Sequence, residues 1–205
     1  CFTQALVNHE LGKACDKSER QVRNDVENWY SLDYTLFYFP KQQTFLYPLG
    51  ESYRYPVVPD EIAGGKGVFC LIPPKGIVTG MLAEVRKITP LSASETQSNI
   101  AAGVSFNDDM EATVDVAYSF TGYAAADIRN SLLEETKENE KDIVKEVVQF
   151  AEAREDIQKY YISNEQPESY NENKPLVITA SVNAPYLTGK AGQKYVFNVG
   201  ELIGP

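Results

Sequence analysis

The strongest constraint in this sequence is a change of hydrophobic period at Gly122, inside the stretch 103–153. Before Gly122, apolar residues recur at every second position, as in a strand with one buried face: Ala112, Val114, Val116, Tyr118 and Phe120. After Gly122, apolar pairs lie four residues apart, as on a helix: Ile128 and Leu132, Ile143 and Val147, Val144 and Val148. A strand therefore leads directly into a helical segment, and the rest of the chain is organised around this junction.

The turn-forming cluster 107–109, with the sequence Asn-Asp-Asp, separates two strand patterns and predicts an antiparallel hairpin over 104–120. The helical pattern extends over 124–152, and the polar run 137–140 predicts a break near residue 138. Acidic residues between 134 and 155 alternate with lysines at helical spacing, which is typical of a solvated helix face. A hairpin followed by helix is a scaffold, and none of these residues indicates chemistry.

Further strands are predicted where apolar and aromatic residues gather between turn signals: 32–39, 44–47, 68–72, 81–88, 157–162, 176–182 and 194–199. The N-terminal stretch 1–28 is predicted to be helical, since Val22 and Val26 lie four residues apart after a partial apolar face. The Ser/Thr-rich stretch 89–98 reads as a linker and divides the chain into domains 1–90 and 91–205. The expected fold class is α+β, with an antiparallel β-rich second domain carrying a helical insertion.

The net charge of −10 indicates a generic acidic surface and argues against nucleic acid as a partner, because phosphate binding needs clustered Lys and Arg. No apolar run approaches the roughly 18 residues of a membrane span. Three cysteines, Cys1, Cys15 and Cys70, permit at most one disulfide, so a disulfide framework is excluded. Because the chain opens at Cys1 without Met, we expect a processed protein or a piece of a longer one.

The sequence carries little or no signal for three kinds of ligand site: zinc, calcium and phosphate. Zinc needs several converging His or Cys ligands, and the chain has one histidine, His9, and no paired-cysteine motif. The pair Asp108-Asp109 fits a solvated turn better than calcium, because no EF-hand pattern surrounds it. The glycine cluster 64–67 reads as a loop, since no Lys-Ser or Lys-Thr of a phosphate-binding loop follows it. We therefore predict no cofactor and no metal.

Aromatic residues crowd the stretch 29–55. Flat rings can stack on sugar faces, but such a run is more often a sheet with large residues on both sides. We expect five of these rings to be at least half buried: Tyr34, Phe37, Phe39, Phe45 and Tyr47.

From Leu32 onward, the order of motifs resembles bacterial transglutaminase-like proteins that carry extra domains of unknown function around their core. In that family, the strand bearing the catalytic His runs into an aromatic-Pro turn, and the next strand carries the catalytic Asp just before a Pro. Segments 32–40 and 45–48 resemble these two strands. The resemblance continues through weaker motifs: Pro59, Gly64-Gly65, 68–72, Gly122, Ala124, Arg129, Pro185-Tyr186 and 194–205. It implies a remnant of a papain-like α+β core followed by an antiparallel β-rich domain.

The catalytic positions depart from the family pattern. Tyr34 stands where the family has His, Tyr47 stands where it has Asp, and Cys1 falls at the nucleophile position. A thiol with a pKa of about 8.5 needs a base or a cationic neighbour to ionise at neutral pH. A phenol with a pKa of about 10 is neither. The triad-like positions are therefore expected to be inert.

The resemblance implies a non-catalytic transglutaminase-like protein of the bacterial envelope, exported to the periplasm or associated with the outer membrane. It would be a binding or structural module with a protein or glycan partner. One alternative is an active cysteine protease or amidase with Cys1 as nucleophile, and another is a carbohydrate-binding module using the aromatics of 29–55. Cys1 also fits an N-terminal nucleophile activated by its own α-amine, or the acylated first residue of a lipoprotein.

Overall fold

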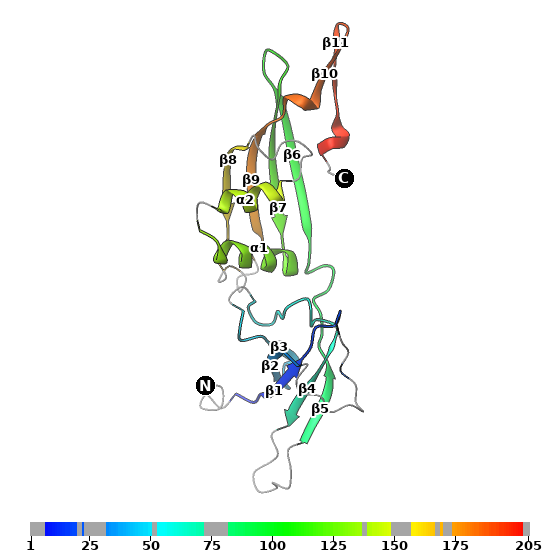
Figure 1. Ribbon diagram of the computed structural model, residues 1–205, viewed down its shortest axis with the longest axis vertical. Coiled ribbons are helices and arrows are strands. Elements are labelled where there is room, and N and C mark those ends of the chain that lie inside the picture. Colours follow the sequence, from blue (N-terminus) through cyan, green and yellow to red (C-terminus); the bar gives the residue numbers. More distant parts are fainter. Residues whose placement is uncertain are drawn as a thin grey trace. The chain divides into compact units, whose positions relative to one another are not determined.

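The computed structural model describes residues 7–19, 22, 32–50, 53–71, 82–136, 139–148, 157–166, 169 and 174–202. The chain divides into two units between Glu95 and Thr96. The boundary lies inside the Ser/Thr-rich stretch and slightly beyond the predicted residue 90. Both units are built on antiparallel sheets, and helices occur in the second, so the fold is mixed and strand-rich at the α+β level (Figure 1).

The first unit is a five-stranded sheet with the strand order β3-β2-β1-β4-β5, in which each neighbouring pair is antiparallel. Its strands are β1 (Glu10–Ala14), β2 (Tyr34–Phe39), β3 (Thr44–Leu46), β4 (Lys66–Leu71) and β5 (Leu82–Lys87). Strands β2 to β5 coincide with predicted strands, and a turn at residues 40–43 connects β2 to β3.

An aromatic cluster forms the core of this sheet. The ring centroids of Tyr38 and Phe45 lie 5.0 Å apart, and those of Phe45 and Phe69 lie 5.5 Å apart. The guanidinium of Arg86 lies 4.5 Å from the centroid of Tyr38 and forms an ion pair of 3.0 Å with Glu10. Burial of flat rings against one another supplies much of the apolar area that a small sheet needs.

The prediction of helix over 1–28 is wrong where the structure describes this stretch. Residues 10–14 form β1, the central strand, which pairs with both β2 and β4. The two residues that β1 buries are Gly12 and Ala14, whereas Leu11 is exposed. A glycine is required at position 12, because a Cβ atom there would lie 2.2 Å from Cδ1 of Phe69. Small inward-facing residues leave almost no hydrophobic periodicity, so a chance helical spacing dominated the pattern.

The second unit contains a four-stranded antiparallel sheet with the order β6-β7-β9-β8. Its strands are β6 (Ser98–Phe106), β7 (Ala112–Phe120), β8 (Ile157–Ser163) and β9 (Leu176–Asn183). The hairpin of β6 and β7 confirms the predicted 104–120 hairpin, with its turn at 107–111. Strand β7 buries all five residues that its period predicted, because they face the hydrophobic core.

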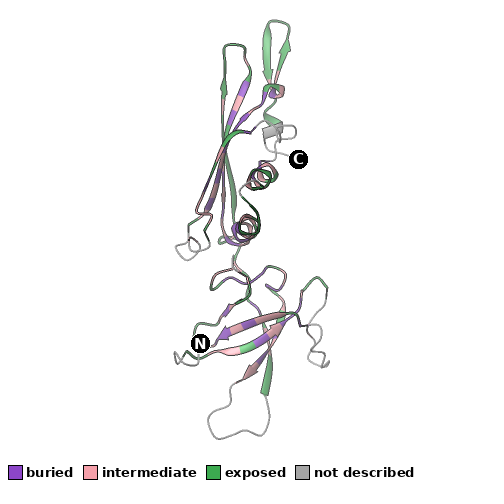
Figure 2. Ribbon diagram, turned by 60° about the vertical axis from the view of Figure 1, so that its left-hand side comes forward, coloured by how far each residue is buried: buried purple, intermediate pink, exposed green. Residues whose placement is uncertain are grey.

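Two helices cover one face of this sheet, as Figures 1 and 2 both show. They are α1 (Gly122–Glu134) and α2 (Glu140–Val147). The predicted break near residue 138 is confirmed, although α2 ends before residue 152 and residues 149–156 lie outside the described part. Gly122 has a φ of 59°, a left-handed conformation that disfavours side chains other than glycine, and it turns the chain from β7 into α1.

A buried arginine ties α1 to the connection between β8 and β9. Arg129 is 1% exposed, and it donates hydrogen bonds from Nε to the Asn164 carbonyl at 3.0 Å and from Nη2 to the Lys174 carbonyl at 3.1 Å. Asn164 has a φ of 60° and donates from Nδ2 to the Pro175 carbonyl at 2.8 Å. Polar groups of this loop thus find partners in the interior, as buried polar groups must.

A small hairpin follows β9, and the sequence predicted it only in part. The short 3-10 helix η3 (Pro185–Leu187) buries Leu187 in the core and leads into β10 (Thr188–Ala191), which pairs with β11 (Lys194–Phe197). A second such helix, η4 (Val199–Leu202), follows. Strand β10 was not predicted, because its residues are mostly exposed and carry no alternation. Across the described residues, no helix is long and apolar enough to cross a membrane.

Candidate functional site

The two tyrosines at the triad-like positions lie side by side in the first unit. Tyr34 opens β2 and Tyr47 follows β3, and their ring centroids lie 6.0 Å apart at an interplanar angle of 47°. Tyr47 also makes an edge contact with Tyr53, again at 6.0 Å between centroids. The three tyrosines therefore form a row of phenol rings.

The surroundings of both phenols favour the protonated form. Burial, followed by the charge of Glu61, raises the pKa of Tyr34 and the pKa of Tyr47 above the ordinary value for a phenol. The pKa of an ordinary phenol is about 10, and this shift moves the pKa still further above 7. Neither side chain can accept a proton from a thiol at pH 7 in the way that a catalytic imidazole does.

The single histidine of the chain serves a different part of the first unit. His9 precedes β1 and is not in a helix, so the prediction of helix is wrong at this residue. Its Nδ1 lies 2.9 Å from the Val7 carbonyl oxygen, and the centroid of its ring lies 5.6 Å from that of Phe37. Cys15 is buried and Cys70 is half-buried. Cys1 lies outside the described residues, so its assignment to the nucleophile position stays a prediction.

The five aromatic rings of the sugar-platform hypothesis are buried or half-buried, as predicted: Tyr34, Phe37, Phe39, Phe45 and Tyr47. Three exposed rings in one plane, which that hypothesis required, are not found among these five. Trp29 and Tyr30 lie outside the described residues.

The other predicted site signals have structural roles. Gly64 and Gly65 exchange backbone hydrogen bonds with Ile88, since Gly64 N donates to the Ile88 carbonyl and Ile88 N donates to the Gly65 carbonyl. The backbone N–H groups of Gly64 and Gly65 thus donate to carbonyl oxygens of the protein, those of Ile88 and Ile62. Asp108 and Asp109 lie in the exposed turn between β6 and β7. In the part of the chain that the structure describes, no three His, Cys, Asp or Glu residues gather as a metal site would require.

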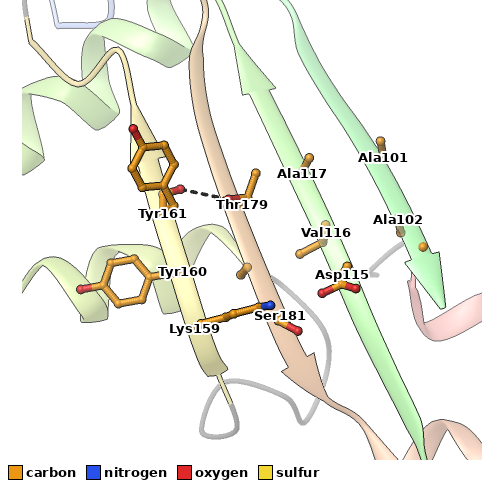
Figure 3. Close-up of a pocket in the computed structure, with 12 residues that line it drawn as sticks. Ala101, Ala102, Asp115, Val116, Ala117, Lys159, Tyr160, Tyr161, Thr179 and Ser181 are labelled. Atoms are coloured by element: carbon orange, nitrogen blue, oxygen red, sulfur yellow. Dashed lines mark hydrogen bonds between the residues drawn. The ribbon is translucent and has the colours of Figure 1, made fainter. Parts of the chain in front are cut away.

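The structure adds a site that the sequence did not predict, on the face of the second sheet that the helices leave open. A cleft of about 660 Å³ crosses the middle of all four strands (Figure 3). Strand register arranges its floor in two rows that run across the sheet. One row is Gly103, Asp115, Ser181 and Lys159. The other is Ala101, Ala117, Thr179 and Tyr161.

The two rows differ in chemistry. The first offers a carboxylate, a hydroxyl and an ammonium group, so it is polar and electrically balanced. The second begins at the ring of Tyr161, which is 68% exposed, and continues over the small side chains of Thr179 and Ala117. Thr179 donates from Oγ1 to the Tyr161 carbonyl at 3.3 Å, as Figure 3 shows. With three strand spacings of about 4.8 Å, the floor is roughly 14 Å wide.

Part of this site had a signal in the sequence. The polar face of β7, with Asp115 and Ala117, follows from the same alternation that predicted the core. What no alternation reveals is the register that aligns Asp115 with Ser181 and Lys159 from strands β9 and β8. Comparison of the chain with protein-family models, with curated proteins and with solved structures found no significant match.

Proposed function

We propose that this chain is a non-catalytic relative of the bacterial transglutaminase-like proteins and acts in the cell envelope as a glycan-binding module. The observation that carries the proposal is the cleft on the open face of the second sheet, with its polar row beside an aromatic and small-residue row. The first unit would be the remnant of the papain-like core, and Tyr34 and Tyr47 would occupy the positions of the lost His and Asp.

The chemistry of the first unit supports the absence of catalysis. Two protonated phenols in mutual contact replace the base and its orienting carboxylate. General-base catalysis is worth about 10²- to 10⁴-fold, and this arrangement lacks it. The runner-up, a cysteine protease or amidase with Cys1 as nucleophile, needs a base beside the thiol. The single imidazole, that of His9, packs against Phe37, which leaves the α-amine of Cys1 as the other candidate base.

The two-row floor favours a sugar as the occupant. A pyranose has an apolar face of C–H groups and a rim of hydroxyls, so it needs a flat ring beside polar groups. Tyr161 supplies the ring, and Asp115, Ser181 and Lys159 supply acceptors and donors. Because one acidic and one basic side chain balance each other, the floor favours a neutral glycan over a strongly charged one.

A peptide is a poorer fit to this floor. Extended peptides gain most of their affinity from backbone hydrogen bonds to an open sheet edge. The cleft crosses the centre of the sheet, where β7 and β9 already pair on both sides. A glycan does not depend on free backbone groups and can lie across the strands.

The test is a glycan-array screen followed by calorimetric titration of the best neutral oligosaccharide. We expect Tyr161→Ala to weaken binding at least about tenfold, in line with the loss of one ring-stacking contact. Tyr195→Ala is the matched control, because Tyr195 is an exposed ring of the same unit outside the cleft. Ser181→Val should also weaken binding by removing a hydroxyl from the polar row.

Two results would overturn the proposal. One is binding that Tyr161→Ala and Ser181→Val leave unchanged, or that Tyr195→Ala weakens equally. The other is amide-bond turnover by the wild-type chain that disappears in Cys1→Ala, which would favour the cysteine enzyme.

A further inference from the structure

The edge strand β6 has the properties of a strand built to be paired. Its nine residues, Ser98–Phe106, include no charged residue and no proline. Within the described residues it pairs with β7 alone, so its outer edge carries unpaired backbone groups. On the helix-covered side of the sheet, Ile100 is 52% exposed, and Phe106 is still 45% exposed although one edge of its ring contacts Phe197. Natural proteins usually protect such an edge with charges, proline or bulges.

The opposite edge of the same sheet shows that protection. Strand β8 carries Lys159, and its register with β9 shifts between Ile157 and Lys159. Both features discourage the addition of a further strand. The contrast between the two edges of one sheet argues that β6 is left open for a partner strand.

The hydrogen-bond pattern identifies which residues of β6 face outward. Thr121 N donates to the Gln97 carbonyl, and Asn107 N donates to the Glu111 carbonyl. Since the register of β6 with β7 is unbroken, the odd-numbered residues bond to β7 and the even-numbered ones point their N–H and C=O groups outward. The outward set within the strand is Ser98, Ile100, Ala102, Val104 and Phe106.

We propose that β6 pairs with the β6 strand of a second copy of this chain, antiparallel and centred on Gly103. In this register Ile100 of each copy faces Phe106 of the other, and Ala102 faces Val104. The two exposed apolar residues thus cover each other, and the outward backbone groups of both strands are satisfied. The seam joins two four-stranded sheets into one continuous sheet.

Side-chain packing favours this register over its neighbour. Centring on Gly103 sets Ile100 opposite Phe106 on both sides of the axis. Centring on Ala102 would set Ile100 opposite Val104 and Phe106 opposite Ser98, so the two most exposed apolar residues of β6 would not meet. Gly103 itself lies at the two-fold axis, where its missing side chain leaves the close approach of the two strands open.

The pairing also affects the cleft described above. Gly103 and Ala101 form the β6 end of its floor, on the face opposite Ile100 and Phe106. Two-fold pairing sets the clefts of the two copies end to end across small residues. The dimer does not depend on the proposed glycan function, because its formation is measured without any ligand.

The first test is sedimentation velocity of the whole chain over a range of micromolar concentrations. We expect a monomer–dimer equilibrium that shifts toward dimer as salt is added, because each copy carries a net charge of −10 and salt screens their repulsion. Ile100→Lys and Ala102→Pro should each raise the dissociation constant about tenfold or more. Ala102→Pro removes an outward N–H and leaves the bonds to β7 intact. Gln158→Lys, on the exposed part of β8, is the matched control and should have no effect.

The register is tested separately by oxidative cross-linking. Gly103→Cys should form a disulfide-linked dimer, since directly opposed residues of a non-hydrogen-bonded pair lie about 4.5 Å apart between Cα atoms. Ala101→Cys should not form this disulfide, because in this register residue 101 of one copy lies opposite Ser105, and not residue 101, of the other copy. Circular dichroism checks that each variant is folded. A wild-type chain that stays monomeric, or a dimer insensitive to both edge variants, overturns the proposal; a cross-link in Ala101→Cys but not in Gly103→Cys overturns the register.

Discussion

Replacing the buried arginine of the second unit is the sharpest test of what holds that unit together. Arg129 links α1 to the connection between β8 and β9 through two backbone carbonyls, those of Asn164 and Lys174. Arg129→Met keeps most of the buried side-chain volume and removes both hydrogen bonds. The variant therefore tests the effect of losing the hydrogen bonds while the packing changes little.

The magnitude follows from the acceptors that are left behind. A buried carbonyl deprived of its partner costs about 1–3 kcal/mol, so two of them cost about 2–6 kcal/mol. Removing a buried cation also relieves its desolvation, which offsets part of that cost. We expect a net loss of about 3 kcal/mol in the free energy of unfolding of the second unit. Lys145→Met is the control, because its ion pair with Asp142 lies on the helix surface and is worth about 0.5 kcal/mol or less.

Native-state hydrogen exchange followed by mass spectrometry is the suitable assay, since it reads the two units separately. A loss of about 3 kcal/mol should speed exchange of the protected amides in β7 and β9 roughly 100-fold. Amides of β2 and β4 in the first unit should keep their wild-type rates. Wild-type exchange in β7 and β9 of Arg129→Met, or an equal acceleration in Lys145→Met, would refute the reasoning.

Further predictions concern the first unit. Gly12→Ala should destabilise it by about 1–3 kcal/mol, measured by hydrogen exchange of β1 and β4, because the new methyl group overlaps the buried ring of Phe69. Gly189→Ala in β10 of the second unit, where a Cβ atom meets nothing within 4 Å, should leave the stability of its own unit nearly unchanged; an equal loss of unit stability in the two variants would contradict the packing argument. The raised pKa values of Tyr34 and Tyr47 predict stability that is fully present below about pH 10 and lost as the pH rises through the folded-state values. Thermal melts from pH 8 to about 11.5 should show that loss, and Tyr→Phe at both positions should flatten it; an unchanged slope in the double variant would count against burial as the cause.

The parts of the fold that could be predicted are those where one face is strongly apolar and the other is wet. Strand β7 is the best case, because five buried residues alternate without interruption. The change of period at Gly122 then predicted α1, and the polar run at 137–140 predicted its separation from α2. In these segments local pattern and tertiary burial agree.

Strand β1 could not be predicted for a physical reason. It lies at the centre of its sheet and buries only Gly12 and Ala14, so its inward face has little hydrophobic signal. Its place is determined by Phe69 of β4, a residue distant in sequence whose ring occupies the space above Gly12. The helix predicted over 1–28 rested on a partial apolar face and on the spacing of Val22 and Val26; it is wrong at residues 10–14, and Val26 lies outside the described residues.

The candidate site also has features that could be predicted from the sequence and features that could not. The contact of Tyr34 with Tyr47 follows from the pairing of β2 with β3, which coincide with the strands predicted over 32–39 and 44–47. The cleft depends on the register of four strands, two of which follow the helical insertion. Buried Arg129 was named only through a family resemblance, since residue type alone predicts an exposed position for arginine.

Cysteine reactivity as a function of pH tests most directly the claim that this chain binds without catalysing. Alkylation of Cys1, Cys15 and Cys70 by iodoacetamide is followed by mass spectrometry from pH 5 to about 9, a range that spans an activated and an ordinary thiol. We predict that no cysteine reacts appreciably at pH 6 and that buried Cys15 is the slowest at every pH. An apparent pKa below about 7 for Cys1, together with amide-bond turnover that Cys1→Ala abolishes, would contradict the account.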